Sequence, residues 1–320
     1  FDLGYVSSNE PFKKLVNQGM ILGNSAFAHR IKNTNDFISF DMIKDEKTQK
    51  IHVDISFVDE KNKLDIEGLK QNNPEFNDVN FIKGESFYVS RDIEKMSKSK
   101  FNVVNPDEIC EQYGADTLRM YEIFLGPIEQ AKPWNTSGIS GVHNFLKKYW
   151  RLFYRNDKWM VTEIEPNKNE LKLLHKTIKK IVSDIENFSF NTCVSSLMIC
   201  VNELTNLDCK SRKILSPLTQ ILYPFAPHVA EEIWESLGHK NTITYEPFPK
   251  VNESYLIEET KNYPVSFNGK LRFKISLSLN LDDNEIKEAI MCDARTERYL
   301  KGSLPKRWVI IQNKIINIVH

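Results

Sequence analysis

The spacing of the apolar residues changes along this chain, and that change restricts the fold more than any other feature. Between residues 140 and 238, apolar residues recur every three or four positions, as on one face of a helix. The segments that follow this pattern are 140–155, 171–188, 194–204 and 217–238, the last with a proline break. Amphipathic helices joined by short connections predict an α-helical bundle, which we place at 137–245.

Alternating apolar and polar residues mark a second kind of structure before the bundle. Apolar residues at every second position of 51–57 would share one face of a strand. The segment 79–90 predicts a hairpin that turns at residues 83–85. We therefore expect a β-rich insertion over 24–92, preceded at 1–22 by the end of a helix and an apolar stretch.

The last part of the chain predicts a small α+β domain at 263–320. Asn268-Gly269 lies between two alternating runs and is a strong signal for a hairpin. A helix at 282–300 and a second pair of short strands around Asn313 would complete this domain. Residues 246–262 contain prolines and little periodicity, so we expect a linker there.

Composition excludes several classes of protein. Lys and Arg total 43, as do Asp and Glu, so a nucleic-acid partner would have to use local basic patches. The five cysteines lack C-x-x-C spacing, which favours buried reduced thiols in a cytosolic protein over a zinc or disulfide site. No apolar run is long enough for a membrane span, and no signal peptide is visible. The chain begins with Phe1, and we expect it to be a fragment of a longer protein.

One short stretch carries the chemistry: Lys95-Met96-Ser97-Lys98-Ser99. Lysine ammonium groups on flexible stems suit phosphate oxygens, and small serines let the backbone approach a ligand. Such a loop can close over a triphosphate and stabilise negative charge as it develops. In isolation, a solvated lysine-serine loop is the commoner explanation of this pattern.

The surrounding residues make the pattern specific. Residues 95–99 resemble the KMSKS loop of class I aminoacyl-tRNA synthetases, and N-V-V-N-P at 102–106 and Y-G-A-D-T-L-R at 113–119 resemble the segments directly after that loop in the family. Segments 10–22, 93–153 and 220–235 resemble the leucine-specific members of the class in their bacterial form. The resemblance covers nearly the whole chain. It implies a multidomain α+β fold. Residues 1–23 would be the end of a Rossmann-like catalytic core, and residues 93–136 would hold the KMSKS loop and its connecting helices. An anticodon-binding-type bundle and a tRNA-binding C-terminal domain would follow.

The resemblance also implies an activity, leucine–tRNA ligation. ATP, accompanied by Mg²⁺, would activate leucine, and the adenylate would acylate tRNA(Leu). Lys95 and Lys98 would be catalytic, neutralising the leaving pyrophosphate, with residues 95–99 in contact with ATP or pyrophosphate. We expect a cytoplasmic monomer that holds no metal of its own.

Two family features are missing from the sequence. None of the seven histidines stands in the H-x-G-H setting of the family's other ATP motif, and no editing-domain signature is visible. We therefore expect this chain to correspond to the C-terminal portion of such an enzyme and not to activate leucine unaided.

Two sets of basic residues are candidates for tRNA contacts. On the helix predicted at 140–155, the spacing of four residues places on one face Lys147, Arg151 and Arg155. On a predicted strand, alternate positions would present on one face Lys270, Arg272 and Lys274. The alternative to a tRNA contact is a solvated helix face for the first set and a charged, exposed strand for the second. Three tryptophans that could stack on bases, but that more often fill cores, are Trp134, Trp150 and Trp234.

Other functions stay open at the level of sequence. The chain could be a tRNA-binding module without chemistry, although such a module would have no reason to carry residues 95–99. It could belong to a sibling ligase for valine or isoleucine, or be a natural subunit of a split enzyme. The role of residues 24–92 is not indicated.

Overall fold

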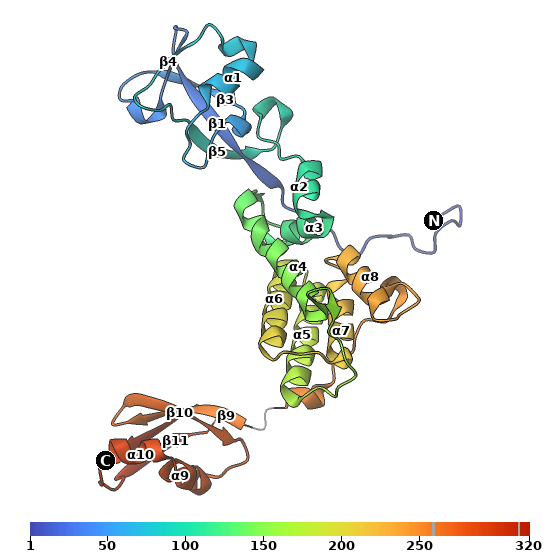
Figure 1. Ribbon diagram of the computed structural model, residues 1–320, viewed down its shortest axis with the longest axis vertical. Helices are drawn as coiled ribbons and strands as arrows, with labels where there is room; N and C mark the ends of the chain where they lie inside the picture. Colours follow the sequence, from blue (N-terminus) through green and yellow to red (C-terminus); the bar gives the residue numbers. More distant parts are fainter. Residues whose placement is uncertain (258–259, 313) are drawn as a thin grey trace. The chain divides into compact units, whose positions relative to one another are not determined.

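The computed structural model describes residues 1–257, 260–312 and 314–320 (Figure 1). Contacts divide the chain into a unit at 1–251 and a unit at 252–320, each described here by itself. The predicted turn residue Asn313, and residues 258–259 of the predicted linker, lie outside the described residues.

A long strand, β1 (Ile21–Ile31), organises the first sheet. Strand β3 (Thr48–Val53) pairs antiparallel along one edge of β1. Along the other edge, β5 (Ser90–Lys95) pairs with the first half of β1 and β2 (Asp36–Ile38) with the second half. Strand β4 (Asn80–Ile82) joins β2 in parallel, and β6 (Lys132–Pro133) joins the start of β1. Because β1 has neighbours on both edges and buried residues at successive positions, it is the central strand of this β-rich region.

Three local predictions for the first 92 residues are wrong. The strand around residue 51 ends at Val53, and Ile55–Phe57 forms a 3₁₀ turn capped by the side chain of Asp54. No hairpin forms at 83–85, because β4 pairs with β2 whereas β5 pairs with β1. Residues 1–20 form neither helix nor strand, and most of their apolar side chains are exposed, so no packing favours a helix there. The short helix α1 (Ile66–Asn72) was not predicted.

Two helices follow the lysine-serine loop. Helix α2 (Pro106–Tyr113) starts at the predicted proline, with Asn105 as the N-cap that accepts the N–H of Asp107. Gly114, at a φ of 88°, turns the chain into α3 (Ala115–Phe124).

Helices form in the region where the sequence predicts a bundle. Its helices are α4 (Ile139–Phe153), α5 (Lys168–Glu186), α6 (Phe190–Asn206), α7 (Arg212–Leu222) and α8 (Pro227–Ser236) (Figure 1). Their apolar faces meet in one core that includes the fully buried side chains of Tyr149, Ile181 and Leu197. No helix within the described ranges is both long and apolar enough to cross a membrane.

The second unit packs a four-stranded sheet with two helices. The strand order is β10-β9-β12-β11, with bounds β9 (Thr260–Phe267), β10 (Lys270–Ser278), β11 (Arg307–Ile311) and β12 (Ile315–Val319). Asn268 and Gly269 both have positive φ, which confirms the hairpin. The helix expected at 282–300 is two helices, α9 (Asp283–Met291) and α10 (Ala294–Leu300), because Asp293 caps a new start.

Candidate functional site

The lysine-serine loop follows directly from a strand of the first sheet. Lys95 is the last residue of β5, and Lys98–Lys100 forms a single 3₁₀ turn preceded by Ser97. Phe101, with a φ of 52°, ends the turn in the left-handed region. The backbone therefore turns within a few residues, and the side chains of Lys95 and Lys98 are exposed.

A buried asparagine fixes this turn from beneath. The side chain of Asn102 is fully buried, and its Oδ1 accepts the N–H of Ser97 at 2.8 Å. Its Nδ2 donates to Ser25 Oγ at 2.8 Å and to the carbonyl oxygen of Lys95 at 3.3 Å. One amide group thus ties both sides of the loop to β1. Sequence reasoning found Asn102 only as part of a motif and assigned it no role.

The loop also lies very close to the backbone of β1. A Cβ on Gly23 would lie 2.5 Å from the carbonyl oxygen of Asn102 and 3.0 Å from Met96 Cγ. Only glycine allows this approach. Met96 itself packs against the apolar core of the bundle, so the structure gives its side chain a packing role.

Lys95 and Lys98 of the loop differ in their partners from Lys100, which follows the loop directly. Lys100 Nζ lies 2.7 Å from Glu94 Oε1, and His52 Nε2 lies 2.8 Å from Glu94 Oε2. The Lys100 ammonium, then Ser25 and His52, hold the pKa of Glu94 down at about 2. Within the described parts of the chain, Lys95 and Lys98 have no carboxylate partner. Two positive charges are therefore available to an anion, and a third is neutralised inside the fold.

The serines of the loop bond to each other. Ser97 Oγ and Ser99 Oγ are 2.9 Å apart, and the backbone of Ser97 is already used by Asn102. Both hydroxyls stay next to Lys98, where they can reorient toward a ligand oxygen.

The glycine-alanine-aspartate motif has a structural place. Asp116 is 8% exposed, and its carboxylate accepts the N–H of Val229 at 2.8 Å and bonds His228 Nδ1 at 2.8 Å. Arg119 adds a contact at 3.2 Å. The motif at 113–119 and the segment 220–235, both of which resemble the family, are thus joined through one carboxylate at the start of α8.

The predicted basic stripe on α4 is only partly helical. Lys147 and Arg151 are exposed on α4, but α4 ends at Phe153 and Arg155 lies in β7 (Tyr154–Arg155). The placement of Arg155 on the helix is wrong, because two residues at positive φ, Asn156 and Asp157, turn the chain into β8 (Lys158–Trp159).

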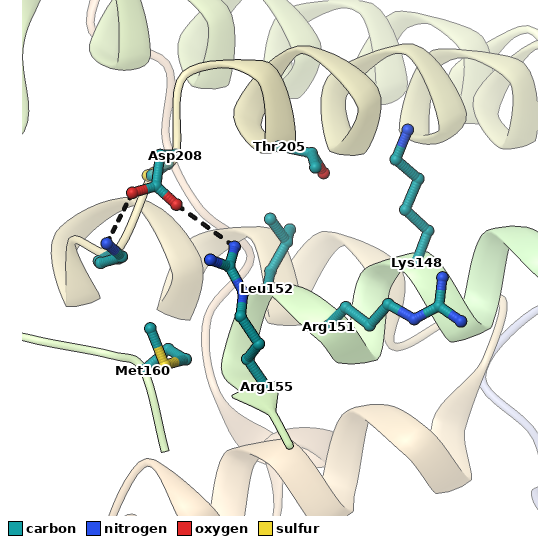
Figure 2. A pocket seen from close by; sticks show the side chains of 9 residues that line it. Lys148, Arg151, Leu152, Arg155, Met160, Thr205 and Asp208 are labelled. Carbon is teal, nitrogen blue, oxygen red and sulfur yellow. Dashed lines mark hydrogen bonds and ion pairs between the residues drawn. The ribbon is translucent and has the colours of Figure 1, made fainter. Parts of the chain in front are cut away.

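A pocket of about 380 Å³ lies beside this face of α4 (Figure 2). Four basic side chains line it together with one carboxylate and an apolar floor: Lys148, Arg151, Arg155, Lys210, Asp208, Leu152, Met160 and Cys209. Lys147 does not line it. Sequence reasoning missed Lys210 and Asp208, which lie more than fifty residues from Arg155 and carry no motif.

The basic residues of β10 do not share one face. Lys270 pairs with Phe267 and Lys274 with Pro264, because a bulge lies between Leu271 and Phe273. Partners three residues apart on β9 lie on opposite faces, so the prediction of one face is wrong. Arg272, at the bulge, lies over the ring of Tyr299, 5.3 Å from its centroid.

The three tryptophans named above pack against other side chains of the protein. Trp134 and Trp234 are buried, and Trp150 stacks on Tyr154. Among the described residues, no three His, Cys, Asp or Glu side chains are grouped so that they could hold a metal ion.

Two family models match the chain. Residues 69–134 match "tRNA synthetases class I (I, L, M and V)", the span that holds the lysine-serine loop. Residues 167–289 match "Anticodon-binding domain of tRNA ligase".

Curated relatives match along the whole chain. The chain is 55% identical to the leucine--tRNA ligase of Christiangramia forsetii over 100% of its length and 33% of that protein. It is 53% identical to that of Flavobacterium johnsoniae over 99% of its length and 34% of the relative. The chain therefore spans about a third of the length of the curated relatives it matches.

A solved structure is similar as well. The crystal structure of an Agrobacterium radiobacter K84 LeuRS in a ternary complex with tRNA and LeuAMS matches with a TM-score of 0.54 and 29% identity. The match covers 71% of this chain and 31% of that one.

Proposed function

We propose that this chain, which matches leucine--tRNA ligases from end to end, is the part of such a ligase that supplies the pyrophosphate-stabilising loop and much of the tRNA-binding surface. The observation that carries the proposal is the difference among the loop lysines. Lys95 and Lys98 are exposed without carboxylate partners in the described residues, whereas Glu94 holds Lys100.

The chemistry depends on that arrangement. When the carboxylate of leucine attacks the α-phosphate of ATP, the bond to the β-phosphate breaks and pyrophosphate leaves with additional negative charge. Lys95 and Lys98 would meet that charge, and Ser97 and Ser99 would donate hydroxyl hydrogen bonds to the departing oxygens. Because Asn102 holds the backbone at Lys95 and Ser97, the peptide chain of the loop needs little reorganisation at this step.

The same proposal covers the partners of the whole enzyme: leucine, ATP and tRNA(Leu), bound by a cytoplasmic monomer. ATP would bring Mg²⁺, whose charge would help to neutralise the phosphates. We assign no residue of this chain to that ion, because the described part of the chain offers no carboxylate cluster for it.

The tRNA-binding surface is proposed from charge and exposure. Lys147 and Arg151 on α4, with Arg155 beyond its end, form one candidate phosphate-binding face. In the second unit Lys270, Arg272 and Lys274 form two smaller ones, divided by the bulge in β10. Such contacts position an RNA without reading its bases.

The test replaces the corresponding third of the Christiangramia forsetii ligase with these 320 residues. In that chimaera Lys98→Ala should slow leucine-dependent ATP–pyrophosphate exchange by about 10²–10³-fold, the usual cost of losing one preorganised charge-stabilising donor. The matched control is Lys83→Ala, an exposed lysine in the turn between β4 and β5, which should leave exchange unchanged.

The outcomes separate the rival functions. Exchange at the unsubstituted rate in the Lys98→Ala chimaera would refute the catalytic role of the loop. A chimaera that charges valine or isoleucine tRNA in preference to leucine tRNA would favour a sibling ligase. A chain that binds tRNA but never restores exchange would favour a binding module without chemistry.

A further inference from the structure

We infer that a pocket on the bundle binds a backbone phosphate of RNA. The carboxylate of Asp208 lies in this pocket, competes with the phosphate and so weakens the binding of RNA. The inference rests on the proposed tRNA binding and identifies the residue that tunes it.

The charges of the pocket are unbalanced. Four basic side chains and one carboxylate, Asp208, line a volume of about 380 Å³, within the usual range of small ligand pockets of about 300–1,000 Å³ (Figure 2). In the described residues, Arg151 has no carboxylate partner, and Lys148 Nζ donates only to the neutral amide of Asn202, at 2.7 Å. The pocket therefore attracts a further anion.

Asp208 occupies the anionic position of this pocket. Its carboxylate reaches Lys210 at 2.6 Å through one oxygen and Arg155 at 3.4 Å through the other (Figure 2). The contact to Arg155 is longer than the 2.7–2.9 Å or so of a strong charged hydrogen bond, and both side chains are more than half exposed. Exposed ion pairs of this kind are weak, so a phosphate can displace the carboxylate from Arg155.

The backbone at Asp208 holds this carboxylate in place. Asp208 lies in the turn between α6 and α7 with a φ of 49°, a conformation that Asp and Asn tolerate better than most residues. Its N–H donates to the carbonyl oxygen of Thr205. Asn at this position would keep the turn and remove only the charge.

The surroundings favour a polymer over a free anion. Arg151 continues from the pocket onto the exposed face of α4, which also carries Lys147, so a second phosphate of the same strand would find a cation there. Leu152, Met160 and Cys209 give the pocket an apolar floor against which a ribose can pack.

The experiment measures binding of the 320-residue chain to a tRNA(Leu) transcript by fluorescence anisotropy from about 50 to 200 mM salt. Asp208→Asn should tighten binding about three- to tenfold at the lowest salt. The slope of the logarithm of the association constant against the logarithm of the salt concentration should become more negative by about 0.9. Arg151→Gln should weaken binding by a similar factor and flatten the slope.

The matched control is Glu186→Gln. Glu186 ends α5 and is exposed, and α6 separates it from Asp208 along the chain, so the same loss of charge should leave binding and slope unchanged. A parallel measurement with inorganic phosphate at matched ionic strength distinguishes a free anion from an RNA backbone. Circular dichroism checks that each variant is folded.

Three results would overturn the inference. First, Asp208→Asn could bind tRNA with the same affinity and salt slope as Glu186→Gln. This result would leave the proposed tRNA binding intact. Inorganic phosphate could bind Asp208→Asn while its affinity for tRNA stays unchanged, which would make the pocket a site for a free anion. No binding of tRNA by any variant would overturn both the inference and the proposed tRNA contacts.

Discussion

The carboxylate of Asp116 accepts the backbone N–H of Val229 at 2.8 Å, across more than a hundred residues of sequence. Asp116 lies in the first turn of α3, the second helix after the lysine-serine loop, and Val229 lies in the first turn of α8. A carboxylate at a helix N-terminus satisfies N–H groups that have no partner within the helix and interacts favourably with the helix dipole. Asp116 therefore links the loop-bearing part of the chain to the last helix of the bundle.

Removing this link should destabilise the bundle. Asp116→Ala leaves the N–H of Val229 and the ring of His228 without their partner, and we expect a loss of about 1–3 kcal/mol in the free energy of unfolding. Urea unfolding followed by circular dichroism measures it. The exposed Glu129→Ala is the control and should change stability by less than about 0.5 kcal/mol. Equal effects of the two substitutions would show that the link contributes nothing.

The pair of Glu94 and Lys100 should make stability depend on pH in the acid range. Chiefly through Lys100, the fold lowers the pKa of Glu94 from 4.5 to about 2. A carboxyl whose pKa is lower in the folded state contributes stability above its unfolded pKa and loses it as the pH falls. The contribution of Glu94 is therefore complete above about pH 4.5 and disappears as the pH falls towards 2.

Urea midpoints of the unsubstituted chain and of Glu94→Gln, measured at about pH 6, 4 and 2.5, test this. The two midpoints should differ at the highest pH and converge at the lowest. Glu85→Gln, an exposed loop position, should show no such convergence. A constant difference between the chain and Glu94→Gln at all three values would contradict the role of the pair.

Two glycines in the same region should respond in opposite ways to alanine. At Gly23 a Cβ would lie 2.5 Å from the carbonyl oxygen of Asn102, so Gly23→Ala must move the loop or the strand. We expect a loss of about 1–3 kcal/mol, as for overpacked cores. Gly84 has open space around its Cα, and Gly84→Ala should be neutral or slightly stabilising. Thermal unfolding of both variants decides it, and an unchanged melting temperature for Gly23→Ala would mean that the close approach is relieved without cost.

Asn102→Ala should free the lysine-serine loop. The substitution removes the partners of the Ser97 N–H, the Ser25 hydroxyl and the Lys95 carbonyl in a buried place. Limited trypsin digestion should then cut faster after Lys98 and Lys100, because the backbone opens more often. Asn144→Ala, on the exposed face of α4, is the control for an asparagine with no such bonds in the described structure. Equal cutting rates in the two variants would show that Asn102 does not hold the turn.

The features that the sequence predicts correctly are local. The spacing of apolar residues predicts α4 to α8, Pro106 predicts the start of α2, and Asn268-Gly269 predicts the hairpin of the second unit. In each case the sequence signal lies within a few residues of the structure that it specifies. Over such short distances helix propensity and capping decide which secondary structure forms.

The features that could not be predicted depend on pairing between distant segments. The strand that ends at Lys95 pairs with β1 and not with the nearby β4, because buried side chains on both faces of β1 make it the better partner. The neutralisation of Lys100 required the turn that brings it back to Glu94. Asn156-Asp157 is a turn signal in the sequence, and as the loop of a two-residue hairpin it places Arg155 in a strand.

The buried amide beneath the turn has a kinetic consequence. Displacing the backbone at Ser97 requires breaking the bonds that Asn102 makes, whereas the ammonium groups of Lys95 and Lys98 need only rotate about their own side-chain bonds. Rotamer changes in exposed side chains take picoseconds to nanoseconds, at least about a thousand times faster than the opening of a lid, which takes microseconds or longer. Charge at this loop can therefore follow a ligand on the timescale of side-chain rotation while the peptide chain beneath it stays still.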